Sequence, residues 1–206
     1  MIENFRKEDY KNTVNLHIHS CFSDGKAMPQ DIVKQAKEKG LRYIAISDHN
    51  TLDAYLKTDI LKEDMVIPAI EFDCWYKTVF YHLLAYEMDV NSKSIKPFLA
   101  KKENETKKDI VRLFSFHRHP KKLIKAIHEA GGLAVLAHPA CCTTLNLDKF
   151  VKTLVSFGLD GLEVYYPYPA KISKLLKFTK IEEVEKIADK YGLIKTGGTD
   201  FHGKVL

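Results

Sequence analysis

Short apolar runs rich in β-branched residues alternate along this 206-residue chain with amphipathic segments of helical period, and no other feature limits its fold as strongly. Seven runs have strand character, at positions 14–19, 43–47, 66–71, 80–86, 133–137, 161–165 and 194–198. Strands that alternate with helices are typical of parallel strands joined by crossover connections. The sequence therefore predicts an α/β fold.

Three intervening segments carry helix start and stop signals. In segment 28–41, Pro29 suits the first helical position and Gly40 suits the end. Segments 119–132 and 181–192 repeat the pattern. Their apolar residues recur at helical spacing: Ile32, Val33 and Ala36 in the first, Leu123, Ile124, Ile127 and Ala130 in the second, and Ile181, Val184, Ile187, Ala188 and Tyr191 in the third. We expect these helices to lie outside a parallel sheet.

Chain length favours a closed arrangement of the strands. Seven βα steps in about 200 residues leave room for short loops only, which favours a closed or nearly closed, TIM-barrel-like barrel. An open doubly wound sheet is the alternative. No repeat, low-complexity tract or linker divides the chain, so one domain over residues 1–206 is expected. The Lys-rich segment 91–116 is predicted to be a helix, ending near Ile110, Val111 and Leu113, that covers one mouth of the barrel.

Composition excludes some classes of protein. The net charge of +5 is scattered rather than gathered into a basic block, so it indicates an anionic ligand only weakly. No apolar stretch reaches the roughly 18 residues of a membrane span, and no apolar signal core follows Met1, so a cytoplasmic protein is expected. The four cysteines lack CxxC spacing and are expected to be reduced, with Cys21 and Cys74 lining a pocket without binding metal.

Imidazole and carboxylate side chains occupy most of the expected strand ends, which is where α/β barrels carry their chemistry. In chain order they are His17 and His19, Asp48 and His49, Glu71, His82 within the fourth strand, His138, Glu163 on the sixth, and Asp200 with His202. Residues i and i+2 of a strand share a face, so His17 with His19, and Asp200 with His202, can each aim two donors at one place. Such donors suit zinc, manganese or iron.

Other residues near these strand ends are expected to have supporting or structural roles. Glu163 is expected to support a ligand or to face substrate, rather than to bind metal itself. Pro139 is expected to hold His138 in extended backbone. The three remaining histidines, His117, His119 and His128, are expected to be structural or solvated.

With these residues in view, the chain resembles the PHP family, the polymerase and histidinol phosphatase superfamily of metal-dependent phosphoesterases. The resemblance runs in order through "HIHSCFSDG", "ISDHNT", Glu71, His82, "EAGGLAVLAHP", "GLEVYY" and "GGTDFH", over nearly the whole length. It implies a distorted (β/α)7 barrel with two or three divalent metals at its C-terminal mouth. It also implies the ligand sets: His17, His19, Glu71 and Asp200 for one metal, Glu71, His82 and His138 for a second, and Asp24, His49 and His202 for a third.

The expected reaction is hydrolysis of a phosphate ester by a hydroxide bridging two metals, with a third metal stabilising developing charge. Glu71, Asp200 and His202 are the expected catalytic residues, and Lys26 and Arg118 the expected phosphate contacts. Asp24 in "SDG" is more similar to the family branch that acts on nucleotides and short oligonucleotides, such as the nucleoside 3',5'-bisphosphate phosphatases. The short, Lys-rich region after the fourth strand departs from the lid of those relatives. The expected partner is a small anionic phosphate ester, with neither a membrane nor an obligate protein partner.

Four alternatives remain open. A histidinol-phosphate phosphatase would share the metals and the reaction. A PHP module assisting a DNA polymerase would need a partner or a continuing chain, whereas this sequence stops just after "FHGKVL". A structural metal protein would bind without turnover. An amidohydrolase-type barrel also uses HxH and a late Asp, but "SDH" after the second strand is not expected there.

Overall fold

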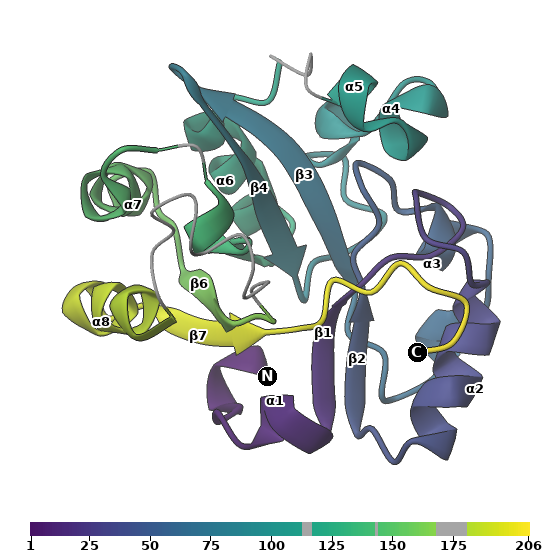
Figure 1. Ribbon diagram of the computed structural model, residues 1–206. Coiled ribbons are helices and arrows are strands. Elements are labelled where there is room, and N and C mark those ends of the chain that lie inside the picture. The colour runs from purple at the N-terminus through teal and green to yellow at the C-terminus, as the bar shows by residue number, and fades with distance from the viewer. Residues whose placement is uncertain (113–116, 143, 168–180) are drawn as a thin grey trace.

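The computed structural model of the chain describes residues 1–112, 117–142, 144–167 and 181–206. Its strands form a parallel pair, β1-β2, and a five-stranded sheet in the order β3-β4-β5-β6-β7 (Figure 1). Their bounds are Val14–Ile18 for β1, Tyr43–Ile46 for β2, Ala69–Tyr76 for β3, Val79–Tyr86 for β4, Leu133–Leu136 for β5, Gly161–Tyr165 for β6 and Ile194–Gly197 for β7. The expected mixed α/β fold is confirmed, and its hydrogen-bonded ladders form open sheets.

In the described part of the chain, four helices of nine residues or more accompany the strands. They are α2 (Pro29–Glu38), α6 (Pro120–Glu129), α7 (Leu147–Val155) and α8 (Ile181–Tyr191). The short elements are η1 (Ile2–Asn4), α1 (Asp9–Asn12), α3 (Asp53–Leu56), η2 (Ile60–Lys62), η3 (Lys96–Phe98), α4 (Asn104–Lys107), α5 (Asp109–Arg112) and η4 (Pro139–Cys141). Within the described residues, no helix is long and apolar enough to cross a membrane.

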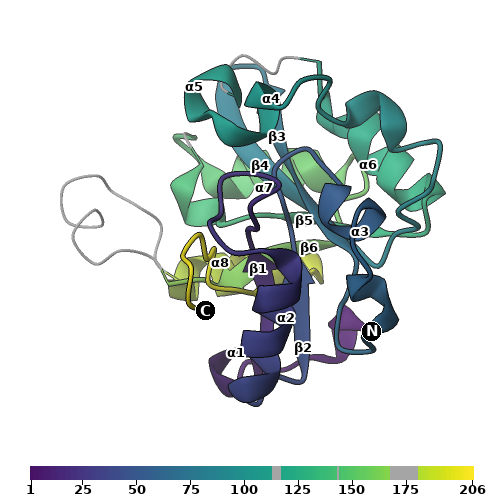
Figure 2. The same cartoon turned by 90° about the vertical axis from the view of Figure 1, so that its right-hand side faces the viewer.

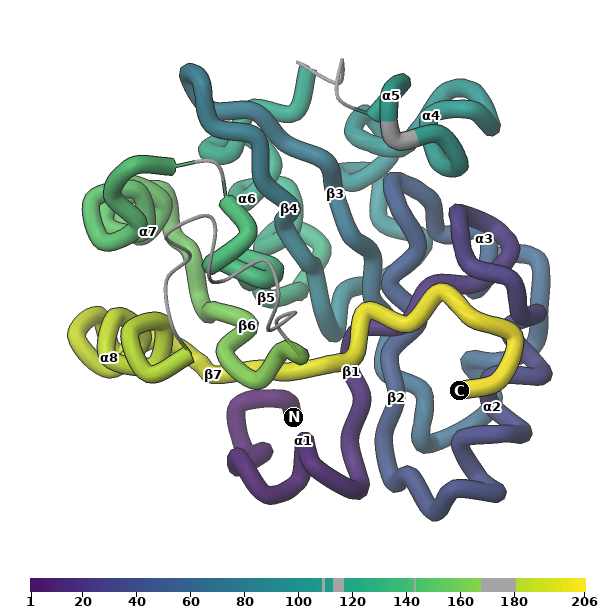
Figure 3. Tube along the Cα trace, viewed as in Figure 1, coloured from purple at the N-terminus to yellow at the C-terminus, as the bar shows by residue number. Residues whose placement is uncertain are grey.

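Isolated bridges connect the two sheets on both sides of β1-β2. Residues Ile44 and Val66, and then His49 and Glu71, pair in parallel beside β2, while Ile18 pairs with Phe201 beyond the end of β7. In Figure 3 the chain leaving β7 runs across the top of β1 and β2. The C-terminal ends of β1, β2 and β7 therefore meet beside β3, and the polar residues at those ends converge.

The direction of β4 corrects the expectation of an all-parallel set. This strand runs antiparallel to both β3 and β5, whereas β5, β6 and β7 are mutually parallel. The cause is local: only Lys77 and Thr78 separate β3 from β4, and Lys77 has a φ of 55°. A two-residue connection permits only an antiparallel hairpin. Strand β3 also extends to Tyr76, so Glu71 lies near its beginning rather than at its end.

The long helices follow their sequence signals and cover the sheets. Helices α2 and α6 begin at Pro29 and Pro120, and the chain turns with positive φ at Gly40 and Gly131 just beyond their ends. The predicted apolar stripes of α2 and α6 are buried, as are Val184, Ile187 and Ala188 of α8. Figure 2 shows α2 lying in front of β1 and β2. Each buried Ile or Leu contributes roughly 1.5–3 kcal/mol to the free energy of folding, so these stripes fix the helices on the sheets.

Segment 91–116 differs from its prediction as one Lys-rich helix. It contains η3 followed by two single turns, α4 and α5, with Lys108 between them in extended backbone. Leu113 lies outside the described residues. Six lysines among its described residues leave few apolar positions to bury, which is why the segment lacks a continuous apolar stripe.

Candidate metal centre

Four ligand atoms converge between β1, β3 and the chain after β7. The Nε2 atoms of His17 and His19 lie 3.1 Å apart, and Glu71 Oε2 lies 3.3 Å from each. Asp200 Oδ1 lies 3.4 Å from the first nitrogen and 3.1 Å from the second. Ligands at about 2.0–2.2 Å from a tetrahedral ion are roughly 3.3–3.6 Å apart. The group thus has the spacing that one divalent ion requires.

The other carboxylate oxygen of Glu71 faces a second group. Its Oε1 lies 3.0 Å from His82 Nδ1 and 3.1 Å from His138 Nε2, and these two nitrogens are 3.2 Å apart. Glu71 therefore stands between two clusters of imidazole nitrogens, one facing each of its oxygens. This is the position that a bridging carboxylate occupies.

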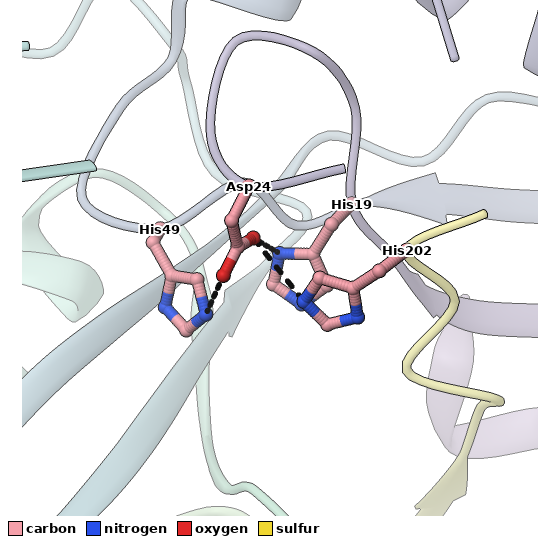
Figure 4. A group of neighbouring side chains, drawn as sticks. All are labelled: His19, Asp24, His49 and His202. Atoms are coloured by element: carbon pink, nitrogen blue, oxygen red, sulfur yellow. Dashed lines mark ion pairs between the residues drawn. The ribbon is translucent and has the colours of Figure 1, made fainter. Parts of the chain in front are cut away.

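Asp24 gathers a third group (Figure 4). Its Oδ1 lies 3.1 Å from His202 Nε2 and 3.6 Å from His19 Nδ1, and its Oδ2 lies 3.6 Å from His49 Nε2. His19 faces this group with Nδ1 and the first group with Nε2. All nine expected ligands thus fall within three adjoining groups.

Burial and charge make these groups suitable for cations. Glu71 Oε2 is buried, and no hydrogen bond reaches it within the described part of the chain. Burial alone would raise the pKa of Glu71, but His82, His17 and His49 hold that pKa well below its usual range. Carboxylates and neutral imidazoles are ligands of divalent zinc, manganese and iron. The residues present therefore fit divalent metals.

Glu163 accepts hydrogen bonds from two of the histidines through nitrogens that do not face the ligand groups. Its Oε1 accepts from His17 Nδ1 at 2.9 Å, and its Oε2 accepts from the backbone nitrogen of His138 at 2.8 Å. The acceptor at Nδ1 leaves the lone pair of His17 on Nε2, which faces the first group. Glu163 thus has the supporting position expected for it.

Asp48 organises the loop that carries Asp24. It accepts from the backbone nitrogen of Ser20 at 2.7 Å and from the hydroxyls of Ser20 and Ser23, each at 2.6 Å. A carboxylate that accepts three local donors folds a short loop tightly. Asp48 therefore positions Asp24, and its own oxygens are not among the converging ligand atoms.

The backbone of His138 corrects a second expectation. Pro139 was expected to keep it extended, but His138 has a φ of 25° and a ψ of 63°. This conformation aims its N–H at Glu163 while its ring faces Glu71. Asp200 also has a positive φ, of 50°. Strained backbone at non-glycine residues is typical of functional sites, where surrounding contacts hold it in place.

Arg118 does not occupy the position expected for a phosphate contact. Its side chain is fully buried, its Nε donates to the Phe98 carbonyl at 2.7 Å, and its Nη1 donates to the Asp73 carbonyl at 3.5 Å. The guanidinium thus ties η3 to β3, and the expectation of a substrate contact is corrected. Lys26 lies exposed in the loop after Asp24, where its role as a phosphate contact stays a prediction. Cys21 is half-buried beside Met28 and Cys74 is buried, outside the three groups.

Three polar residues at the centre were missing from the sequence prediction. Asp73 Oδ1 lies 3.1 Å from His82 Nε2 and 3.4 Å from His49 Nδ1. Arg112 Nη1 lies 2.7 Å from Asp24 Oδ2, and Tyr166 donates to Asp200 Oδ2 at 2.9 Å. The two-residue period of β3 places Asp73 on the same face as Glu71, a signal that could have revealed it. No local pattern marks Arg112, which lies 88 residues from Asp24.

Comparisons with known proteins agree with this geometry. The family model described as the PHP domain matches residues 15–192. An uncharacterized protein of Methanocaldococcus jannaschii is 29% identical over 167 residues, which are 75% of this chain and 81% of that protein. A phosphoribosyl 1,2-cyclic phosphate 1,2-diphosphodiesterase of Eggerthella lenta is 37% identical over 81 residues, 39% of this chain and 27% of that protein. The crystal structure of a candidate metal-dependent phosphoesterase from Bifidobacterium adolescentis superposes with a TM-score of 0.74 at 21% identity, covering 95% of this chain and 89% of that one.

The chain belongs to the PHP domain family. Family membership, together with the three ligand groups, confirms the expectation of a metal-binding hydrolase that acts on phosphoric ester bonds. The similar crystal structure shows the shared fold.

Proposed function

We propose that this chain hydrolyses the phosphate ester of a small nucleotide or short oligonucleotide, with divalent ions held by the nine expected ligands. The observation that carries the proposal is the sharing of Glu71 between two groups, with Oε1 and Oε2 each 3.0–3.4 Å from the imidazole nitrogens that they face. His17, His19, Glu71 and Asp200 would hold one ion, Glu71, His82 and His138 a second, and Asp24, His49 and His202 a third.

Divalent ions bound here would supply a nucleophile at neutral pH and positive charge against the phosphate. The chain's own residues would fix the geometry. Glu163 holds the ring of His17, and Asp48 holds the loop of Asp24. Tyr166 donates to Asp200 Oδ2, which leaves Oδ1 facing the histidines. Preorganised ligands of this kind cost little reorganisation during the reaction.

A neighbouring cavity supports a substrate larger than phosphate alone. It has a volume of about 630 Å³ and adjoins the loop of Asp24, with Phe22, Leu52 and Leu56 among its apolar lining. Lys101 and Lys102 are among its lining residues, as are the acidic Asp53 and Glu103, and the ammonium of Lys57 sits 5.9 Å from the centre of the Phe22 ring. Apolar side chains combined with more lysines than carboxylates suit an aromatic base carrying phosphate groups.

We also propose that the seven strands form one distorted (β/α)7 barrel within a single domain, residues 1–206. The bridges Ile18–Phe201, Ile44–Val66 and His49–Glu71 support this, because they lie at both seams between the two sheets. The two buried apolar clusters support it as well. One contains Leu16, Ala45 and Leu84, while the other contains Ile18, Ile44 and Leu83, so each cluster draws on β1, β2 and β4.

The test is phosphate release by metal-loaded protein from four substrates: a nucleoside 3',5'-bisphosphate, a short oligonucleotide, a ribose cyclic phosphate diester and histidinol phosphate. We expect the highest kcat/KM for one of the nucleotides. Glu71→Gln should lower kcat at least about 10³-fold, because it removes the shared carboxylate. Glu63→Gln, which changes only an exposed partner of Lys37, is the control.

Two results would contradict the proposal. Preference for histidinol phosphate would favour the histidinol-phosphate phosphatase. A metal-loaded protein that hydrolyses no ester, and in which Glu71→Gln changes only thermal stability, would be a structural metal protein.

A further inference from the structure

Arg112 places a positive charge inside the third ligand group. Its Nη1 lies 2.7 Å from Asp24 Oδ2 and donates to the Thr106 carbonyl at 3.1 Å, while its Nε lies 3.5 Å from Asp73 Oδ1. Only 8% of the Arg112 side chain is exposed. The guanidinium is therefore held from three directions, and its interaction with Asp24 is weakly screened by water.

Asp24 Oδ2 is also the oxygen that faces His49. It lies 3.6 Å from His49 Nε2, whereas Oδ1 faces His202 and His19. A divalent ion that joined His49 to Oδ2 would stand beside the guanidinium. Two cations a few ångströms apart repel strongly in a partly buried site.

The charge of the whole centre also disfavours a third divalent ion. Among the residues that the structure describes, five carboxylates lie within 3.7 Å of an imidazole nitrogen of the centre, namely Asp24, Glu71, Asp73, Glu163 and Asp200. With the one guanidinium they give four net negative charges while the imidazoles are neutral. Two divalent ions neutralise that charge, and a third would leave an excess of two positive charges inside a buried centre.

We propose that the guanidinium of Arg112 competes with a divalent ion for Asp24, so that the chain binds two divalent ions tightly and a third at least about tenfold more weakly. The inference rests on the proposed division of the ligands, but not on turnover. Arg112 is a positioning residue here, because it acts on the metal through Asp24.

The experiment is a titration of the metal-free full chain with Mn²⁺, in which bound ions are counted by equilibrium dialysis and unbound Mn²⁺ is followed by electron paramagnetic resonance. Wild type should bind two ions tightly and a third at least about tenfold more weakly. Arg112→Gln should tighten the third ion at least about tenfold, whereas Arg112→Lys, which keeps the charge, should stay within about threefold of wild type. Arg42→Gln, at an exposed arginine over the Tyr43 ring, is the matched control and should leave all three affinities unchanged.

Three ions of equal affinity in wild type would overturn the inference, as would an unchanged third affinity in Arg112→Gln or the same tightening in Arg112→Lys. Should Arg112→Gln not fold, anomalous scattering from Mn²⁺-soaked wild-type crystals decides. Two full sites with Arg112 on Asp24 support the inference, and three full sites with that ion pair intact overturn it. If the ion counts agree with this inference while no ester is hydrolysed, only the proposed function is refuted.

Discussion

At the residue scale, the buried carboxylates of this protein have two different structural roles. Glu71 and Asp200 aim oxygens at imidazole nitrogens inside the ligand groups, whereas Glu163 takes hydrogen bonds on the outer side of the same histidines. An outer partner fixes the tautomer and orientation of a metal-binding imidazole. The affinity of the centre for metal should therefore depend on residues that never touch the ion.

Substitution Glu163→Gln tests this dependence. The amide can accept from only one side, so its NH₂ group would face either the His17 N–H or the His138 N–H, two donors that Glu163 now satisfies. We expect metal affinity to fall about 10–100-fold. The free energy of unfolding should fall by about 1–3 kcal/mol.

Calorimetric titration with Zn²⁺ and thermal unfolding measure the two effects. Glu63→Gln, on the exposed pair with Lys37, should change neither. Wild-type metal affinity in Glu163→Gln would show that the outer hydrogen bonds do not orient the ligands.

At the element scale, the close approach of the chain after β7 to β1 positions Asp200 and His202. A Cβ at Gly198 would overlap the Cβ and backbone nitrogen of His17. Asn15 holds the next residue, accepting from the Thr199 backbone nitrogen at 3.0 Å and donating to its hydroxyl at 2.8 Å. Glycine is required at 198 because no side chain fits between the two segments.

Gly198→Ala should therefore push the segment of Asp200 away from β1. We expect a loss of at least about tenfold in metal affinity together with about 1–3 kcal/mol of stability, as for other overpacked sites. Gly40→Ala is the matched control, since Gly40 has a φ of +72° but an added Cβ there would meet no atom within 4 Å.

The control should lose stability alone, because the cost there is backbone strain. Equal metal affinity in the two variants, measured by the same titration, would show that the close approach at Gly198 does not position the ligands.

Sequence signals at this scale predicted the elements unevenly. Helices α2, α6 and α8 follow from apolar period, an initial proline in the first two, and a terminal glycine, all encoded within about a dozen residues. The direction of β4 depends on the two-residue turn at Lys77 and Thr78, and strand periodicity alone does not report direction.

At the scale of the whole molecule, histidines of the metal-free centre bind protons more tightly than free histidine does. Burial alone would lower the pKa of His19, but hydrogen bonds with Asp200 and Glu71 outweigh it and raise the pKa to about 9. Burial likewise opposes the protonation of His138, while hydrogen bonds with Cys141 and Glu71 raise its pKa to about 10. Metal binding requires neutral imidazoles, so loading must release protons.

The pH dependence of stability follows from these directions. A raised folded-state pKa contributes stability that is complete below the unfolded value of about 6.5 and is lost as pH rises through the folded value. Metal-free protein should therefore lose on the order of 1 kcal/mol of unfolding free energy per pH unit between about pH 7 and 9. Zn²⁺-loaded protein should lose less, because the ion replaces the protons.

Urea unfolding of metal-free and metal-loaded protein across this range measures the difference. Stability of the metal-free form that rises with pH would show that His19 and His138 are neutral in it.

Most of the long elements, and the chemistry at the strand ends, could be predicted from the sequence alone, because periodicity, caps and strand ends are local properties. His17 and His19 could be placed on one face from their spacing alone, and all nine expected ligands converge. The residues that complete the centre become visible only in the folded molecule. Arg112 reaches Asp24 across 88 residues, Arg118 is buried against Phe98 and Asp73, and His138 adopts a strained backbone. These outcomes depend on how distant segments pack, and no local pattern specifies them.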